Sequence, residues 1–188
     1  MEVAGNSSSG LTRAMWIDAA LDALARGGVA AVAVESIATR LKATKGSFYW
    51  HFTNRDALVV AALEEWERRN TADVIADLEA HSHPAVQLRE LFHRAFGSAH
   101  INAVDAAVLA DAESPLVAPV LDRVTRRRLA YLERAYSGLG LSPADAQRQA
   151  LLAYTTYLGV FSLRRAAPGL ISDDDLMVAL EPLLSPRT

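Results

Sequence analysis

The chain has 188 residues, 51% of them hydrophobic, and a formal charge of −3. This hydrophobic content is enough to bury a core, which excludes a wholly disordered chain, and the length indicates one or two compact domains. The absence of cysteine excludes disulfides, thiolate metal sites and redox sensing through thiols. Alternating runs of the strand type are nearly missing, so the sequence predicts an all-α fold.

Residues 1–10 form a polar, Gly- and Ser-containing arm that we expect to be flexible, and no function is assigned to it. This N-terminus lacks a basic end followed by an apolar signal core. No apolar run approaches the ~20 residues needed to cross a bilayer. We therefore expect a cytoplasmic protein without a membrane partner.

Residues 11–56 are predicted to form a domain of three helices. The first runs from about residue 11 to 26 and ends at Gly27-Gly28. The second has an apolar face at helical spacing, made by Val34, Ile37, Ala38 and Leu41. Lys42-Ala43 makes the turn, and Thr44 caps the third helix by accepting a backbone N–H. Two short helices around such a turn are typical of a helix-turn-helix, so double-stranded DNA is the expected partner.

The third predicted helix separates packing residues from recognition residues. Phe48 and Phe52, four residues apart, share one face and anchor the helix to the core. Gly46 leaves the backbone bare for a close approach, and the partial positive charge at the helix start suits a phosphate. Hydrogen-bond donors and flat rings are dense here, namely Lys45, Ser47, Tyr49, Trp50 and His51.

The charge distribution favours DNA binding by the first part of the chain. Residues 1–56 carry a net charge of +1, and residues 57–188 carry −4. Between Ser36 and Arg55 every charged residue is basic, namely Arg40, Lys42, Lys45 and Arg55. Phosphate binding requires a local positive footprint of this kind.

The segment from Ile37 to Leu58 resembles the TetR family of bacterial one-component transcriptional regulators. The resemblance rests on Tyr49-Trp50-His51-Phe52, an aromatic pair followed by histidine and phenylalanine, and on the run Asn54-Arg55-Asp56 after it. It places Thr44, Lys45, Ser47, Tyr49, Trp50 and His51 on the DNA side. The bare backbone of Gly46 and the basic cluster add Gly46, Arg40, Lys42 and Arg55 to the candidate DNA-binding residues. Lys45 and Ser47 are the candidates for base edges, and Tyr49, His51 and Arg55 for phosphates, whereas Trp50 is open to a packing role.

Two residues depart from the family pattern. Ala33 lies where members usually have a Thr or Ser that caps the second helix, a loss worth roughly 1 kcal/mol of helix stability. Lys42 lies where the turn commonly has Gly, so either the turn avoids positive φ or Lys42 adopts it at some strain.

Residues 57–188 are expected to form a helical effector-binding and dimerisation domain, which brings the total to about nine helices. Thr53, with Asp56 as a capping-box-like partner, is predicted to cap a long fourth helix that joins the two domains and ends at the His81–Pro84 break. The remaining helices are expected over about residues 86–97, 104–112, 115–138 and 143–165, and from 173 onward. Their start signals include Ser114-Pro115, Ser142-Pro143 and Ser172-Asp173.

The last two predicted helices are the dimer candidates. The helix over residues 143–165 is apolar around most of its circumference, more than one internal face requires. The family resemblance implies a four-helix contact between two subunits, with Leu151, Tyr154, Leu158, Leu176 and Leu180 as candidate interface residues. The alternative is a central helix buried within one subunit.

The resemblance also implies a small-molecule cavity, with Phe92, Phe96, Leu109, Tyr154, Tyr157 and Phe161 as candidate lining. Plain core packing is the competing interpretation of each. An aromatic lining with little convergent charge favours an apolar or weakly polar ligand. Three consecutive arginines, Arg126-Arg127-Arg128, span three helix directions, so they are interpreted as a solvated face or as partners for nearby acids and left out of any site.

The chain is therefore predicted to be a dimeric DNA-binding transcriptional regulator, a repressor released by a small apolar or amphipathic effector. One alternative is a regulator whose C-terminal half docks a protein partner instead. A helical enzyme using the aromatic cavity is the alternative of another class, but no catalytic motif or phosphate-binding glycine loop occurs. The scattered histidines lack a ligand spacing, so we expect no metal and no cofactor.

Overall fold

The computed structural model describes residues 11–97, 101–167, 169–170 and 172–184, and every regular element in them is a helix. The predicted arm, residues 1–10, lies outside the described residues. Because α4, η2 and α5 follow one another without a break, these residues contain nine α-helical segments, and the all-α prediction is confirmed. The elements are α1 (Arg13–Gly27), η1 (Val29–Ala31), α2 (Val34–Arg40), α3 (Lys45–Tyr49), α4 (Arg55–Glu67), η2 (Arg68–Ala72), α5 (Asp73–Glu79), α6 (Pro84–Gly97), α7 (Ile101–Ala110), α8 (Ala118–Gly138), α9 (Pro143–Ala166) and α10 (Asp173–Leu184).

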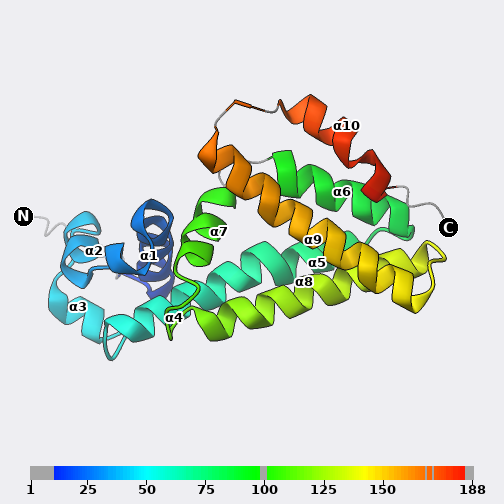
Figure 1. The fold of residues 1–188 in the computed structure, drawn as a ribbon. Coiled ribbons are helices and arrows are strands. Elements are labelled where there is room, and N and C mark those ends of the chain that lie inside the picture. The colour runs from blue at the N-terminus through cyan, green and yellow to red at the C-terminus, as the bar shows by residue number, and fades with distance from the viewer. Residues whose placement is uncertain (1–10, 98–100, 168, 171, 185–188) are drawn as a thin grey trace, which may run out of the picture.

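The helices form a small group at one end and a larger bundle at the other (Figure 1). The small group is α1 to α3, and α4 leads from it into the bundle, where it continues through η2 into α5. Among the described helices, none combines the length and the apolar composition of a membrane span.

Most helix starts follow the capping residues expected from the sequence. The Thr44 side chain accepts the Ser47 N–H at 3.2 Å, and the Ser142 hydroxyl accepts that of Asp145 at 3.2 Å. Two starts differ. Asn54, not Thr53, caps α4, with 2.8 Å between the Ala57 nitrogen and the Asn54 Oδ1 atom, since an amide oxygen is the stronger cap of the two neighbours.

The start of α8 also lies later than expected. The residues after Ser114 form turns, and the helix begins at Ala118 with Pro119 in its first turn. Two prolines four residues apart each fit a first helical turn, and the second one begins this helix.

The first hydrophobic core holds the small group together and continues beyond it. Trp16 on α1 is fully buried and meets Phe48 of α3 edge to face, with 5.4 Å between ring centroids. The same core includes Val108 on α7 and Val120 on α8. The predicted domain division after residue 56 stays a prediction, because side chains from both sides of it share this core.

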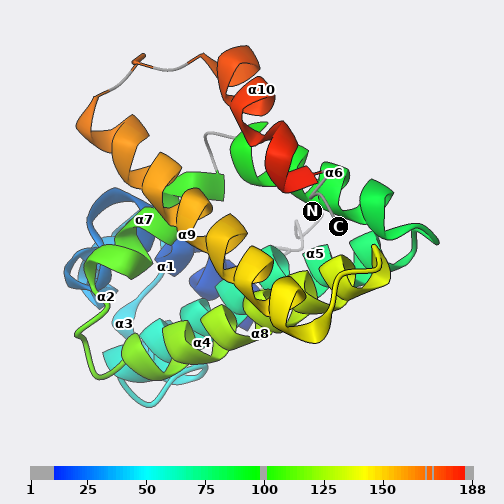
Figure 2. The same ribbon diagram turned by 45° about the vertical axis from the view of Figure 1, so that its right-hand side comes forward.

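A second core fills the bundle between α6, α8, α9 and α10. Leu88, Phe92 and Tyr136 are among its buried members, and the Tyr136 hydroxyl donates to the Leu183 carbonyl at 2.9 Å. This bond ties α8 to the end of α10, which lies beside α6 (Figure 2). Leu176 and Leu180 of α10 are buried here, inside a single chain.

The connecting helix changes its hydrogen-bond pattern midway. Segment η2 is a π-helical turn. Such turns are rare in proteins, and those that occur are frequently found at functional sites. Glu65, just before it, accepts from Arg68 at 2.7 Å and pairs with Arg69 at 2.5 Å. The Arg68 guanidinium, opposed by partial burial and helped by Arg69, lowers the pKa of Glu65 to about 2.

Acid is therefore expected to weaken the connecting helix through Glu65. A carboxylate whose folded-state pKa is depressed stabilises the fold above its unfolded pKa, and this contribution is lost as the pH falls toward about 2. Glu65→Gln should remove roughly 1–3 kcal/mol of the free energy of unfolding at neutral pH and flatten its dependence on pH in acid. Denaturant unfolding at stepped pH measures this. Asp122→Asn, at an exposed pair with Arg126, is the control and should change little.

Candidate nucleic-acid interface and internal cavity

Helix α3 is oriented by its buried aromatic residues. Phe48 is fully buried, Phe52 is 4% exposed, and their stacked rings lie 5.7 Å apart. With this face fixed against the core, the opposite face is open: Tyr49 is 63% exposed and Trp50 is 88% exposed. Thr44, Lys45 and Gly46 are exposed beside them, and Ser47 is partly exposed. The structure thus brings most of the predicted DNA-facing residues onto one surface.

The turn before α3 adopts the strained alternative. Lys42 has φ of 53°, in the left-handed region that favours glycine. The Ala43 N–H donates to the Ala38 carbonyl at 2.8 Å, which ends α2. The other departure, Ala33, gives α2 no side-chain cap, as expected from its methyl group.

Two of the four basic residues of this surface are less available to DNA than the sequence indicates, because the fold brings an acid to each of them. Lys45 Nζ lies 2.6 Å from Glu35 Oε1, and this hydrogen bond raises the lysine pKa. Arg40 pairs with Asp22 at 3.5 Å and also donates to the Ala19 carbonyl. Both acids precede the stretch from Ser36 to Arg55 in which every charged residue is basic.

Arg55 has a structural role within the chain. Its Nε donates to the Val32 carbonyl at 2.7 Å, and Nη2 donates to the carbonyl of Val29. Nη1 lies 3.2 Å from Asp56 Oδ1. A half-buried guanidinium with these partners fixes η1 against the start of α4, and the phosphate contact of Arg55 stays a prediction.

His51 is also engaged within the chain. Its Nε2 lies 2.8 Å from the Leu11 carbonyl, which accepts, so the ring carries its proton on that nitrogen. The ring is partly buried and holds the segment before α1 against the end of α3. His51 thus has a positioning role, and its phosphate contact stays a prediction.

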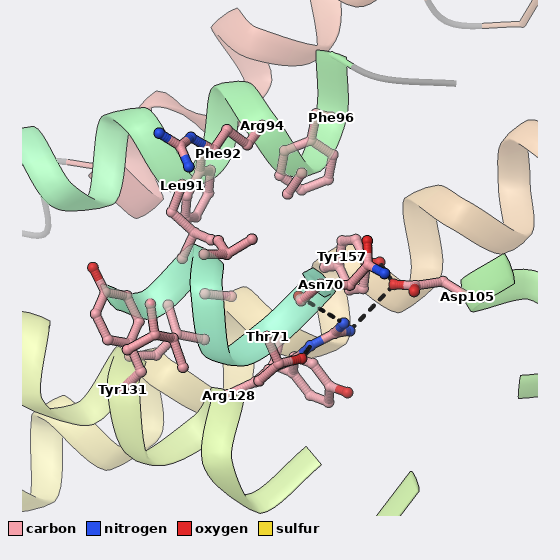
Figure 3. Close-up of a pocket in the computed structure, with 16 residues that line it drawn as sticks. Asn70, Thr71, Leu91, Phe92, Arg94, Phe96, Asp105, Arg128, Tyr131 and Tyr157 are labelled. Atoms are coloured by element: carbon pink, nitrogen blue, oxygen red, sulfur yellow. Dashed lines mark hydrogen bonds and ion pairs between the residues drawn. The ribbon is translucent and has the colours of Figure 1, made fainter. Parts of the chain in front are cut away.

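A cavity of about 210 Å³ lies inside the bundle (Figure 3). Phe92, Phe96, Tyr154 and Tyr157, four of the predicted lining residues, are in its wall. Leu109 and Phe161 are not among the described lining residues, and both are partly buried elsewhere. The other lining residues are Asn70, Thr71, Val74, Ile75, Leu91, Arg94, Ala95, Asp105, Arg128, Tyr131, Leu132 and Ala153.

A buried ion pair lies at one end of the cavity, where the sequence predicted little charge. Arg128 Nη1 is 3.2 Å from Asp105 Oδ2, and the two side chains are only 17% and 3% exposed. The Arg128 guanidinium carbon lies 5.6 Å from the centroid of the Trp66 ring. Of the two interpretations of Arg126-Arg127-Arg128, a solvated face or partners for nearby acids, the second holds for Arg128, which also lines the cavity. A lone acid in an otherwise apolar helix, Asp105, was the signal that pointed to a buried partner.

The candidate dimer residues fall into two groups. Tyr154, Leu176 and Leu180 are buried within the chain, and Leu158 packs on the same core, so these four do not form a free surface. Leu151 is 55% exposed. The all-round apolar pattern of α9 therefore combines an inner face, satisfied by its own bundle, with an outer face.

The architecture is that of a helix-turn-helix regulator, in which a capped recognition helix is joined through a long helix to an α-helical bundle with a cavity. Residues 17–62 match the family described as bacterial regulatory proteins, tetR family. No curated protein sequence matches the chain.

Solved structures with the same fold cover nearly the whole chain. One is SmeT, described as the repressor of the Stenotrophomonas maltophilia multidrug efflux pump SmeDEF, with 26% identity over 93% of this chain and 89% of that chain and a TM-score of 0.71. A TetR-family transcriptional regulator from Agrobacterium tumefaciens has 19% identity over 92% of this chain and 97% of that chain, with a TM-score of 0.74. A transcriptional regulator from Rhodococcus sp. Rha1 has 20% identity over 93% of this chain and 94% of that chain, with a TM-score of 0.75. Residues 17–62 therefore carry the DNA-binding domain of the tetR family, and nearly the whole chain shares its fold with TetR-family transcriptional regulators.

Proposed function

We propose that the chain is a homodimeric repressor that binds a pseudo-palindromic operator and leaves it when a small apolar molecule enters the cavity. The observation that carries this proposal is the continuous helix α4–η2–α5. It begins beside the exposed face of α3, and its residues Asn70 and Thr71 line the cavity. A change at the cavity therefore has a direct mechanical route to the recognition helix. We propose no catalytic role.

The outer face of α9 supports the proposal of a dimer. Leu151, Leu152 and Leu163 are exposed, and the positions between them on this face are small and uncharged: Thr155, Gly159 and Ser162. A Cβ atom at Gly159 would meet nothing within 4 Å apart from its two neighbours in the chain and the backbone of its own helix. A glycine in a helix interior lowers the stability of the helix by roughly 0.5–1 kcal/mol. Packing within one chain gives no reason for this glycine, whereas a second helix that approaches closely would need a small residue here.

Lys45→Ala is expected to weaken operator binding and to reduce its dependence on salt, because fewer counterions are released. Glu35→Gln, which removes the partner of Lys45, should strengthen binding and steepen the salt dependence. If Lys45 contacts a base edge, the alanine variant should also relax preference at one base pair, by about 1–3 kcal/mol. Fluorescence anisotropy with labelled duplexes over a salt series measures each slope. Half-sites selected from random duplexes should lie roughly 34–36 Å apart or a multiple of this. Binding that is independent of salt would contradict the DNA-binding role of this surface.

The release step is tested by linkage. A molecule that raises the melting temperature of the free protein should lower its operator affinity, and operator should lower the affinity for that molecule by the same factor. Ala95→Trp, which fills the cavity beside Phe92 and Phe96, should abolish the thermal shift and leave operator binding intact. If every stabilising molecule leaves operator affinity unchanged, release by a ligand is refuted, and a protein partner for the C-terminal half becomes the better proposal.

A further inference from the structure

The cavity has two ends of different chemistry (Figure 3). Aliphatic and aromatic side chains, including Leu91 and Phe92, form most of the wall. The polar end is formed by Arg128 of α8, Asp105 of α7 and Tyr157 of α9. The charge at this end bears on which ligands the cavity can accept, since burying an ion without a partner costs free energy.

The charges at the polar end cancel within the chain. Asp105 Oδ1 accepts the Trp66 indole N–H at 2.7 Å, and Oδ2 accepts from Arg128 and from the Tyr157 hydroxyl. Burial raises the pKa of the Tyr157 hydroxyl, and the neighbouring carboxylate raises it further, so this group stays protonated as a donor. Asp105 thus has three donors around its single negative charge.

The guanidinium is held equally well. Arg128 Nε donates to Thr71 Oγ1 at 3.0 Å, Nη2 donates to the Asn70 carbonyl at 3.2 Å, and Nη1 lies against Asp105. Each of its three nitrogens therefore has an acceptor in the chain. An ion pair that is buried, neutral and satisfied on both sides requires no counter-charge from a ligand.

Arg94 is the other charged residue among the described lining residues, and it does not compensate an ion inside. It pairs with Glu90 at 2.9 Å and with Asp77 at 3.2 Å. Its side chain is 35% exposed, and the guanidinium extends away from Arg128 (Figure 3). Solvent and the carboxylates of Glu90 and Asp77 already compensate the charge of Arg94 at the edge of the cavity.

We infer that the cavity takes an uncharged ligand about the size of one substituted aromatic ring. This inference rests on the function proposed above, in which a ligand enters the cavity. A charged ligand would lose its hydration and meet a pair whose charges already cancel. An apolar cavity of about 150 Å³ holds benzene, and this one is about 210 Å³, which leaves room for short substituents.

The aromatic wall favours a ring over an alkyl chain. Phe96 lies 6.1 Å from Tyr157 between ring centroids, in an edge-to-face arrangement, and Phe92 lies 5.6 Å from Phe96. Tyr154 continues this series, 6.1 Å from Tyr157. A ligand ring placed among them gains edge or offset contacts that a chain of methylenes does not provide.

Three probes of nearly equal shape test the inference: para-ethylacetophenone, para-ethylbenzoate and para-ethylbenzylamine. At neutral pH the first is uncharged, the second is an anion and the third is a cation. Calorimetry with the full-length protein, without DNA, should show binding of the ketone and binding at least ~100-fold weaker of both ions. Equal or tighter binding of either ion would overturn the inference.

Two substitutions are expected to change the preference in opposite directions. Asp105→Asn keeps the shape and leaves the Arg128 charge unbalanced, so affinity for para-ethylbenzoate should rise at least ~10-fold relative to the ketone. Arg128→Met leaves Asp105 unbalanced and should favour para-ethylbenzylamine instead. The double variant restores neutrality and should again prefer the ketone. Circular dichroism checks that each variant is folded, and Asp105→Asn alone is sufficient to decide if Arg128→Met does not fold.

These outcomes are separable from those of the proposed function. If the ketone is preferred and binding leaves operator affinity unchanged, the ligand class holds and the release step fails. If no charge preference is seen while some other molecule releases the operator, the release step holds and the ligand class fails. An unchanged preference in a folded Asp105→Asn protein would also contradict the role given to the ion pair.

Discussion

Replacing Leu152 and Leu163 together with arginine should separate the proposed dimer and abolish tight operator binding. Both side chains are exposed on the outer face of α9, and a partner helix packed there would bury two unpaired charges. Because linking two binding heads raises affinity by roughly 100- to 10,000-fold, a monomer should lose a factor of this size. Sedimentation gives the oligomeric state, and anisotropy gives the operator affinity.

The exposure of these residues makes the experiment selective. Leu158, also a candidate interface residue from the sequence, packs on the inner core, so a charge there would damage the subunit itself. Val86→Arg is the control, since Val86 is an exposed hydrophobic residue (46%) on a different helix, α6. A wild-type protein that sediments as a monomer at micromolar concentration would contradict the dimer, whatever the variants do.

Arg128→Ala is expected to cost about 3–5 kcal/mol of the free energy of unfolding, because it leaves the Asp105 carboxylate buried without its counter-charge. Arg126→Ala, two residues away, removes a partner of Asp122 from an exposed pair and should cost less than about 1 kcal/mol. Chemical denaturation at neutral pH measures both.

The comparison is sharp because the two arginines have the same chemistry and nearly the same position in the chain. Their side chains are 17% and 78% exposed. Similar costs for the two variants would show that water reaches the Asp105 pair. Asp105→Asn/Arg128→Met should recover most of the loss, since a neutral pair of similar volume needs no counter-charge.

Local signals were sufficient to predict the helices and most of their ends. Thr44 and Ser142 cap α3 and α9 as expected, because capping depends on a side chain and the backbone three residues on. The two errors, at Asn54 and Pro119, arose where neighbouring residues offered the same signal twice. Local chemistry allowed both starts, and packing decided between them.

The candidate site was less predictable, because its charges depend on contacts between distant segments. Glu35 and Asp22, which precede the all-basic stretch in the sequence, neutralise part of the basic surface. Arg128 meets Asp105, 23 residues earlier, and Thr71, 57 residues earlier. A run of three arginines shows no pattern that marks its last member as buried, since only the bundle decides which helix face is inside.

The first core, shared by the two predicted domains, bears on the design of hybrid sensors. Such sensors combine the DNA-binding domain of one regulator with the effector-binding domain of another. Val108 on α7 and Val117 before α8 are buried against the N-terminal helices, and Asp111 Oδ2 accepts the Val29 N–H at 2.6 Å. A graft that ends after residue 56 would place these valines and this carboxylate against a foreign surface. The transplantable unit is therefore discontinuous: residues 11–56 need the segment around residues 104–124 to travel with them.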